Sequence, residues 1–320
     1  MVQPIMTETM PDFELRPLKD SDRSEYALLV HSSFNSWYWR KGWCNDYFRC
    51  PPEDAAIFYD IYNDLTPASS VAAIDRKTGV IMGACFYHPR EYHVSLGIMS
   101  VHPSFCGLGV GKALVNYIID FARQKGYKSI RLVGSAINMD SFSLYNKSGF
   151  VPQKTYHDMV IQVPAGGISG TVPGIERVRD ARVDDAHAMG EIEFEVSGIK
   201  RLQDYLYLVE NRRGLFGVKV LENPEGRLDG FMGSIKHPAL NMIGPGVART
   251  EEGAAALIRA SLQRFRNESV LTVVPMDCLK LVSRMYAWKA RNVETHLCQV
   301  WGEFKPFNGV SIPSFLPETG

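Results

Sequence analysis

The apolar positions in the first half of the chain follow a strand period in some segments and a helix period in others. Arg76-Lys77-Thr78-Gly79 separates two apolar runs, which is the pattern of a β-hairpin. Residues 112–125 have apolar side chains at helical spacing, and Gly126 ends this predicted helix. A shorter helix is predicted to end at Gly149. Four segments have the pattern of β-strands: 70–75, 80–87, 93–101 and 129–133. Antiparallel strands that lead into a strand–helix–strand unit predict a mixed α/β sheet.

A segment rich in glycine and proline interrupts this pattern near the middle of the chain. Residues 163–174 contain four glycines and two prolines, a composition typical of a linker. We therefore predict two domains, residues 1–163 and 175–320, joined by a linker at 164–174. Residues 306–320 are predicted to form a poorly periodic tail.

The patterns before and after the linker resemble each other, which indicates a weak internal duplication. Residues 13–22 have the pattern of a short strand followed by a helix cap, and residues 176–185 have the same pattern. Residues 144–147 likewise resemble residues 285–288. Three pairs of residues align: Arg16 with Arg179, Asp22 with Asp185 and Tyr145 with Tyr286. Chance similarity between short patterns is the alternative explanation.

Composition narrows the class of protein. The length of 320 residues fits about two domains of ordinary size. The 35 basic and 35 acidic residues cancel, and both halves are balanced, so a broad basic surface for nucleic acid is not expected. The sequence contains no run of 18 apolar residues, so no membrane-spanning helix is predicted. Met1–Glu8 lacks the pattern of a signal peptide. Six cysteines without a CxxC motif predict a reduced, cytoplasmic protein with no metal site.

Three alternating glycines between a predicted strand and a predicted helix are the most specific feature. Glycines in the segment Cys106-Gly107-Leu108-Gly109-Val110-Gly111-Lys112 let a ligand approach the backbone closely, and the helix start offers N–H groups to an anion. A phosphate-bearing ligand is one explanation, and a tight turn without a ligand is the other. The segment does not match a Walker loop, because its glycine spacing differs and Ala113 stands where Ser or Thr is needed. Its glycine spacing also differs from that of a Rossmann fingerprint.

This loop resembles the coenzyme A loop of the GNAT family of N-acetyltransferases. A second motif agrees, because Asn138-Met139-Asp140-Ser141-Phe142-Ser143-Leu144-Tyr145-Asn146-Lys147-Ser148-Gly149-Phe150 is similar to the family's N-x-x-A-x-x-L-Y-x-K-x-G-F segment. The family usually has Arg or Gln where Cys106 stands. The resemblance covers residues 13–162 well and 175–303 weakly. It implies two tandem GNAT-like domains, each a mixed, mostly antiparallel sheet flanked by helices, with the second domain degenerate.

The resemblance also implies acetyl-CoA as cosubstrate and direct acyl transfer to the amine of a small molecule or peptide. The loop would bind the pyrophosphate, the strand before it would pair with the pantetheine arm, and the N–H of Met99 would polarise the thioester carbonyl. Lys112 could contact a phosphate or be solvated. The implied cofactor-binding residues are Met99, Ser100, Val101, Gly107, Leu108, Gly109, Val110, Gly111, Lys112 and Asn138.

Tyr145 is the candidate general acid, because a phenol can protonate the leaving thiolate. A tyrosine that only packs in the core is the alternative. Glu91, His93 and His88 are candidate general bases, although a role as a loop residue is the favoured explanation for each, and a water chain could also serve as the base. The aromatic cluster of residues 37–43 could line an acceptor pocket or simply pack.

Two functions fit this sequence: an N-acetyltransferase, and a non-catalytic acyl-CoA sensor or interaction module on the same fold. The identity of the acceptor and a homodimer are left open. We predict that the C-terminal half binds no coenzyme A. Its counterpart of the loop, residues 242–254, is too short, contains Pro245 without an N–H, and places Glu251 and Glu252 at the helix start.

Overall fold

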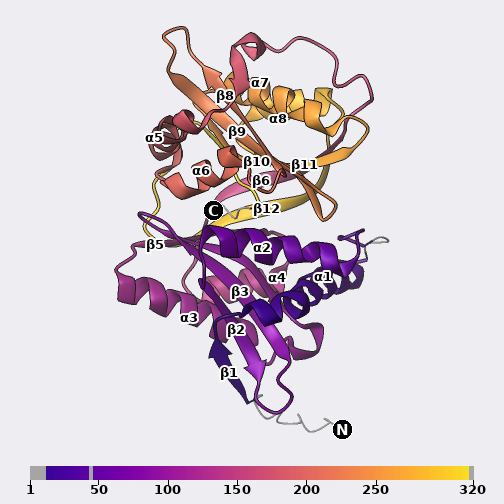
Figure 1. Ribbon diagram of the computed structural model, residues 1–320, viewed down its shortest axis with the longest axis vertical. Coiled ribbons are helices and arrows are strands. Elements are labelled where there is room, and N and C mark those ends of the chain that lie inside the picture. The colour runs from indigo at the N-terminus through magenta and orange to yellow at the C-terminus, as the bar shows by residue number, and fades with distance from the viewer. Residues whose placement is uncertain (1–11, 43–45, 317–320) are drawn as a thin grey trace, which may run out of the picture.

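One mixed β-sheet runs through the whole molecule. The computed structural model describes residues 12–42 and 46–316, and within them thirteen strands form this sheet, with helices on both faces (Figure 1). The elements of the N-terminal half are β1 (Phe13–Arg16), α1 (Arg23–Arg40), α2 (Ala56–Leu65), β2 (Ser70–Asp75), β3 (Ile81–Pro89), β4 (Val94–Val101), α3 (Val110–Lys125), β5 (Ser129–Ser135), α4 (Met139–Lys147) and β6 (Val151–Gln162). Those of the C-terminal half are β7 (Val178–Asp180), α5 (Ala186–Ser197), α6 (Leu202–Glu210), β8 (Phe216–Glu222), β9 (Leu228–His237), β10 (Leu240–Ala248), α7 (Glu251–Ser261), β11 (Ser269–Pro275), α8 (Leu279–Ala287), β12 (Arg291–Gly302) and β13 (Val310–Ile312).

The strands and helices predicted in the first half are present, and the mixed α/β class is confirmed. The hairpin is formed by β2 and β3, the next two predicted strands are β4 and β5, and the predicted helix is α3. The prediction for the tail is wrong in part. Residues Val310–Ile312 form β13, because the edge of β10 offers them backbone hydrogen bonds.

The helices divide between the two faces of the sheet. Apolar side chains of α1, α2, α5 and α6 share one core, which extends across both halves of the chain. On the other face, α3 and α4 cover the N-terminal half of the sheet, and α7 and α8 cover the C-terminal half, with a separate core under each pair. The two lobes are therefore joined by a common core on one face and by a continuous sheet.

The internal duplication is visible in matched ion pairs. Arg16 Nη1 lies 2.6 Å from Asp22 Oδ2, and Arg179 Nη1 lies 2.7 Å from Asp185 Oδ2. In both halves the aspartate also accepts a backbone N–H three residues earlier in the chain, which fixes the entry of the following helix. This confirms two of the three aligned pairs.

The third pair is off by one residue. α4 and α8 are both nine residues long, and each is followed by a residue with positive φ, Gly149 at 91° and Lys289 at 67°. These landmarks align Tyr145 with Met285. Met285 is buried whereas Tyr286 is exposed, so the two tyrosines occupy different faces of their helices.

Strand β6 of the N-terminal half and strand β12 of the C-terminal half each lie beside the other half. The strand order is β1-β2-β3-β4-β5-β12-β6-β11-β10-β9-β8-β7, with β13 beside β10. β12 is antiparallel to β5, with Ser135 opposite His296, and β6 is antiparallel to β11. The sheet thus crosses the linker 164–174 without a break, and a division into two independent domains there stays a prediction.

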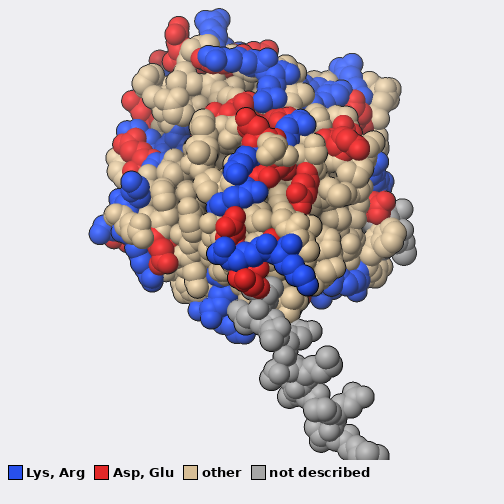
Figure 2. Space-filling model, turned by 60° about the horizontal axis from the view of Figure 1, so that its bottom comes forward, with Lys and Arg blue, Asp and Glu red and all other residues tan. Residues whose placement is uncertain are grey.

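Charged residues of both signs are mixed on the surface at the bottom of the N-terminal lobe. Figure 2 shows Lys and Arg side chains interspersed with Asp and Glu on this face, without a broad patch of one sign. No described helix has the length and apolarity needed to cross a lipid bilayer.

Candidate functional site

The glycine loop leads directly into α3. Gly107 and Gly109 both have φ 83°, a left-handed conformation that side chains with a Cβ avoid. Gly109 is the N-cap of α3, and none of the side chains that the structure describes caps this helix start. The first turn of α3 has no acidic residue. A Cβ on Gly111 would lie 3.2 Å from Leu144 Cδ2, so glycine lets α3 approach α4. The helix start therefore offers its N–H groups and positive dipole end to an anion.

Next to the loop, β4 and β5 separate. These parallel strands pair only at Val94–Ile130 and Ser95–Arg131. Met99, Ser100 and Val101 continue to pair with β3 on one side. On the other side, no strand among the described residues pairs with residues 96–101. The residues predicted to hold a pantetheine arm thus lie on a strand edge that can accept an added extended group.

Tyr145 lies against the end of β5. The side chain is 7% exposed, its ring centroid is 5.7 Å from that of Phe150, and its Cε2 would lie 3.9 Å from a Cβ on Gly134. Asn138 begins the same helix, and its Oδ1 accepts the N–H of Ser141 at 3.2 Å. The predicted hydrogen bond from Asn138 to the cofactor would therefore be donated by its Nδ2.

The three predicted bases lie on or beside the β3–β4 hairpin. Glu91 is exposed and forms an ion pair with Lys200 at 3.2 Å. His93 Nε2 lies 3.1 Å from Ser95 Oγ, and His88 Nδ1 lies 2.5 Å from Thr66 Oγ1. Burial holds the pKa of both histidines well below the usual range, and nearby arginines add to this effect. Both rings are neutral, and their role as bases stays a prediction.

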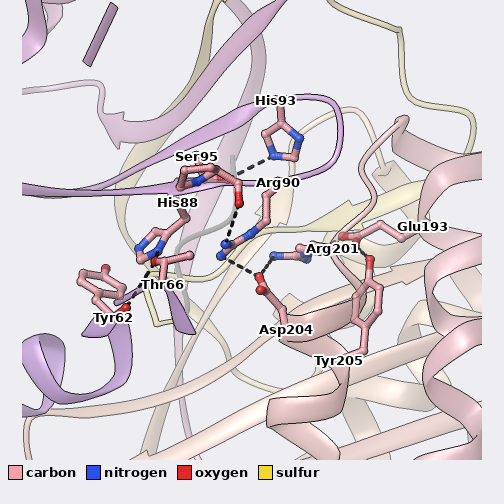
Figure 3. Close-up of polar contacts among 11 residues, drawn as sticks. Tyr62, Thr66, His88, Arg90, His93, Ser95, Glu193, Arg201, Asp204 and Tyr205 are labelled. Atoms are coloured by element: carbon pink, nitrogen blue, oxygen red, sulfur yellow. Dashed lines mark hydrogen bonds and ion pairs between the residues drawn. The ribbon is translucent and has the colours of Figure 1, made fainter. Parts of the chain in front are cut away.

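The same hairpin is locked to the C-terminal lobe by a buried ionic network (Figure 3). Arg90 Nη2 lies 2.9 Å from Asp204 Oδ2, and Arg201 donates to both carboxylate oxygens of Glu193 at 2.6 and 2.9 Å. The hydroxyl of Tyr205 also donates to Glu193. Two cations and two carboxylates balance one another, so this network fits a structural connection between the lobes.

A second buried polar cluster lies at the end of β5. It contains Asp158 of β6 with Glu294 and His296 of β12, which are 2%, 6% and 7% exposed. The hydroxyl of Tyr38 donates to Glu294 Oε2 at 2.5 Å, and Ser135 donates to Glu294 Oε1.

Burial sets the charge of this cluster. It raises the pKa of Glu294 and, together with the neighbouring Glu294 charge, raises that of Asp158 well above its usual range. Burial also lowers the pKa of His296 to about 4. Among the described residues, the only basic partner of these carboxylates is His296, with Nδ1 3.4 Å from Asp158 Oδ2. The cluster therefore holds buried carboxyl groups without a permanent cation.

The aromatic cluster at residues 37–43 contributes one side chain to this region. Tyr38 stacks on Tyr47 with ring centroids 4.7 Å apart and reaches Glu294. Trp37 packs edge-on against Tyr38, and Trp39 is largely exposed. Trp43 lies outside the described residues.

Comparison with known proteins agrees with this geometry. Residues 33–150 match the family model described as Acetyltransferase (GNAT) family. The N-terminal half contains a GNAT-family domain. Two curated relatives match part of the chain. The spore coat polysaccharide biosynthesis protein SpsD of Bacillus subtilis is 24% identical over 47% of this chain and 51% of its own length. N-acetyltransferase 8B of Homo sapiens is 38% identical over 19% of this chain and 27% of its own length. The chain thus spans about half of the first relative and about a quarter of the second.

Solved structures extend the likeness to both halves. A putative acetyltransferase from Pyrococcus horikoshii has a TM-score of 0.75 at 16% identity, covering 99% of this chain and 98% of that one. A tandem GNAT protein from the clavulanic acid biosynthesis pathway has a TM-score of 0.61 at 14% identity, covering 91% of this chain and 98% of that one. The fold is therefore that of two tandem GNAT-like domains.

The GNAT-like cofactor region of the C-terminal half is built differently. Only Arg249 and Thr250 separate β10 from α7, and the Thr250 side chain caps the helix by accepting the N–H of Gly253 at 3.0 Å. Glu251 and Glu252 occupy the first turn, as predicted. They also line a cavity of about 530 Å³ between α7 and α8. This helix start is already capped and negatively charged, which disfavours a phosphate.

The strand edge in the C-terminal half is also occupied. β10 and β11 pair only at Met242–Leu271 and Ile243–Thr272 before they separate. Gly246, Val247 and Ala248 then pair with β13. The matching bulges in β3–β4 and β9–β10 make these residues the counterparts of Met99, Ser100 and Val101. The chain's own tail thus fills the position that is open in the N-terminal half.

Proposed function

We propose that the N-terminal half transfers an acetyl group from acetyl-CoA to a primary amine of a small molecule or peptide by direct attack. The observation that carries this proposal is the open edge of β4 beside an uncapped helix start with no acidic residue in its first turn. A thioester bound there supplies the activated acyl group.

The residues of the chain would act in three ways. The loop Gly107–Lys112 would hold the pyrophosphate through backbone N–H groups, and the β4 edge would align the pantetheine arm. The N–H of Met99 would stabilise the negative charge on the carbonyl oxygen during attack. Tyr145 would give its proton to the leaving thiolate. Cys106 replaces a polar side chain near the pyrophosphate, so binding would depend mainly on the backbone donors.

A non-catalytic acyl-CoA sensor is the second candidate function, because the same loop and strand edge would serve binding alone. Tyr145 of α4 lies against the end of β5, and a proton donor at this position favours the enzyme. The test is release of coenzyme A from acetyl-CoA over a panel of primary amines, together with isothermal titration. Binding with amine-dependent release supports the transferase, binding without release supports the sensor, and absence of binding overturns both.

A further inference from the structure

We propose that Glu294 takes the proton from the acceptor ammonium. This residue lies on β12, a strand of the C-terminal half that pairs with β5 of the N-terminal half. This inference rests on the proposed transferase function and assigns a catalytic contribution to the half without a cofactor site. It replaces the hairpin residues as the general base.

The two faces of β5 separate the roles of acid and base. Side chains of neighbouring residues in a strand point to opposite faces. Gly134 faces Tyr145 on the side of α3, whereas Ser135 faces Glu294 and Tyr38 on the side of α1. An amine approaching the carbonyl from the α1 side would meet Glu294, and the thiolate would leave toward Tyr145. Acid and base therefore lie on opposite sides of the place where β4 and β5 part.

The surroundings of Glu294 favour its ionised form over that of Asp158. It receives hydrogen bonds from Tyr38 and Ser135, which favour the ionised form. For Asp158, the structure shows no comparable pair of hydroxyl donors among the described residues. Its Oδ1 is buried without a hydrogen-bond partner among the described residues, and it faces the charge of Glu294. Two neighbouring buried carboxyls do not both ionise readily, so Asp158 keeps the proton and Glu294 the charge.

This arrangement calls for a cation, and an ammonium group provides one. Buried charges require a partner, and no lysine or arginine pairs with Glu294 among the described residues. Within the described part of the chain, the titratable groups around Glu294 are Tyr38, Tyr47, Asp158 and His296. His296 is neutral because burial lowers its pKa to about 4. Burial raises the pKa of Glu294, which makes this carboxylate a stronger proton acceptor than an exposed one.

The proton and bond changes balance. The ammonium gives one proton to Glu294, which passes it to solvent, and the neutral amine forms the C–N bond as the C–S bond breaks. Tyr145 protonates the thiolate, and the second proton lost from nitrogen restores the Tyr145 hydroxyl. The products are an amide, a thiol and one released proton.

Two kinds of nucleophile test the assignment. Alkylamines are protonated at neutral pH and need a base, whereas hydroxylamine is mostly unprotonated and does not. The full chain is assayed for coenzyme A release with a panel of primary alkylamines, diamines, amino sugars and amino acids, and with hydroxylamine. We expect Glu294→Gln to slow transfer to the amines by about 10²–10⁴-fold and to leave transfer to hydroxylamine close to the wild-type rate.

Two further variants complete the experiment. Glu303→Gln, just beyond the same strand, is the matched control and should leave both rates unchanged. Tyr38→Phe keeps the stacking on Tyr47 but removes one donor to Glu294, so the acid limb of the pH–rate profile should move to higher pH. Thermal stabilisation by acetyl-CoA verifies that each variant folds and binds.

Three results would overturn the assignment. Equal slowing of both nucleophiles by Glu294→Gln would make the residue structural, and an unchanged amine rate would make it irrelevant. A stoichiometric metal ion in the purified protein, whose removal stops transfer to both nucleophiles, would assign Asp158, Glu294 and His296 to a metal instead. If wild-type protein binds acetyl-CoA but transfers to no nucleophile, the proposed function itself fails.

Discussion

The two halves share a scaffold but differ at every position that the proposed chemistry uses. In the N-terminal half β4 has an open edge, α3 begins without a side-chain cap, and α4 carries Tyr145. In the C-terminal half β13 covers the strand edge, Thr250 caps α7, and Met285 stands where the phenol would be. A thioether cannot donate a proton.

The comparison shows that two halves can keep one architecture while they differ at the helix start and the strand edge. The Arg–Asp pairs, the strand bulges and the paired helices are retained on both sides. The interactions that changed are at the helix start and the strand edge, where backbone groups are otherwise free to bind a ligand. In the C-terminal half the chain's own residues satisfy those groups, and we therefore expect this half to bind no coenzyme A.

The largest expected effect is on binding of acetyl-CoA. Gly109→Glu would place a negative side chain at the N-cap of α3, in a left-handed conformation, and should abolish the binding. Gly79→Glu is the matched control, because Gly79 also has positive φ, at 77°, and open space around it. Isothermal titration should give one site per chain in wild type and in Gly79→Glu, and none in Gly109→Glu. Two sites in wild type would overturn the prediction that the C-terminal half binds no coenzyme A, and binding that survives Gly109→Glu unchanged would overturn the assignment of the glycine loop.

The next effect concerns turnover. Tyr145→Phe removes only a hydroxyl, so kcat should fall by about 10²–10⁴-fold while the Kd for acetyl-CoA changes little. Tyr286→Phe is the control in the other half, since Tyr286 is exposed on α8 and should not affect kcat. Steady-state kinetics with an accepted amine provide the measurement. Wild-type turnover in Tyr145→Phe would place this tyrosine among the packing residues.

Local patterns were sufficient to predict the strands and helices of the first half, the glycine loop and Tyr145. Each of these depends on residues close together in the sequence. The cluster of Asp158, Glu294 and His296 could not be predicted in this way, because it forms only when β12 pairs with β6. The apolar patterns of β6 and β12 do not specify their neighbours. The sequence therefore does not show that β12 of the C-terminal half lies between β5 and β6 of the N-terminal half.

A similar limit applies to β13 and to the role of the hairpin residues. Three residues are too few to give a periodic signal, and β13 is defined by its partner β10. His88 and His93 suit proton transfer by residue type, but the structure buries them as neutral rings beside Arg90. Burial by a distant part of the chain is not visible in local sequence.

The connection between the halves predicts a loss of stability. Asp204→Asn would leave Arg90 buried without its counter-charge and should lower the free energy of unfolding by about 3–5 kcal/mol. Asp64→Asn breaks an ion pair across the same interface, with Arg213, but both side chains are about one-third exposed, so the cost should be about 0–1 kcal/mol. Urea unfolding measures both. The double variant Arg90→Met with Asp204→Leu should recover part of the loss, and failure to do so would point to packing rather than charge.

A smaller effect than that of Asp204→Asn concerns a feature that the halves share. Burial alone would raise the pKa of Asp22, but Arg16 and the N–H of Lys19 outweigh it, and hydrogen bonds from Arg179 lower the pKa of Asp185. A carboxyl with a lowered pKa adds stability above its ordinary pKa of 3.8, and this stability is lost as the pH falls through the folded-state value.

Asp22→Asn should therefore cost about 1.5–3 kcal/mol at pH 7, and its difference from wild type should shrink as the pH falls below 3.8. Asp185→Asn should cost less, because Arg179 keeps a second partner, Glu222, at 2.6 Å. Unfolding by urea at several pH values measures both variants. Since β6 and β12 join the two lobes in one sheet, each substitution should shift a single cooperative transition. Two separate transitions, each moved by only one of the substitutions, would mean that the halves unfold independently despite the shared strands.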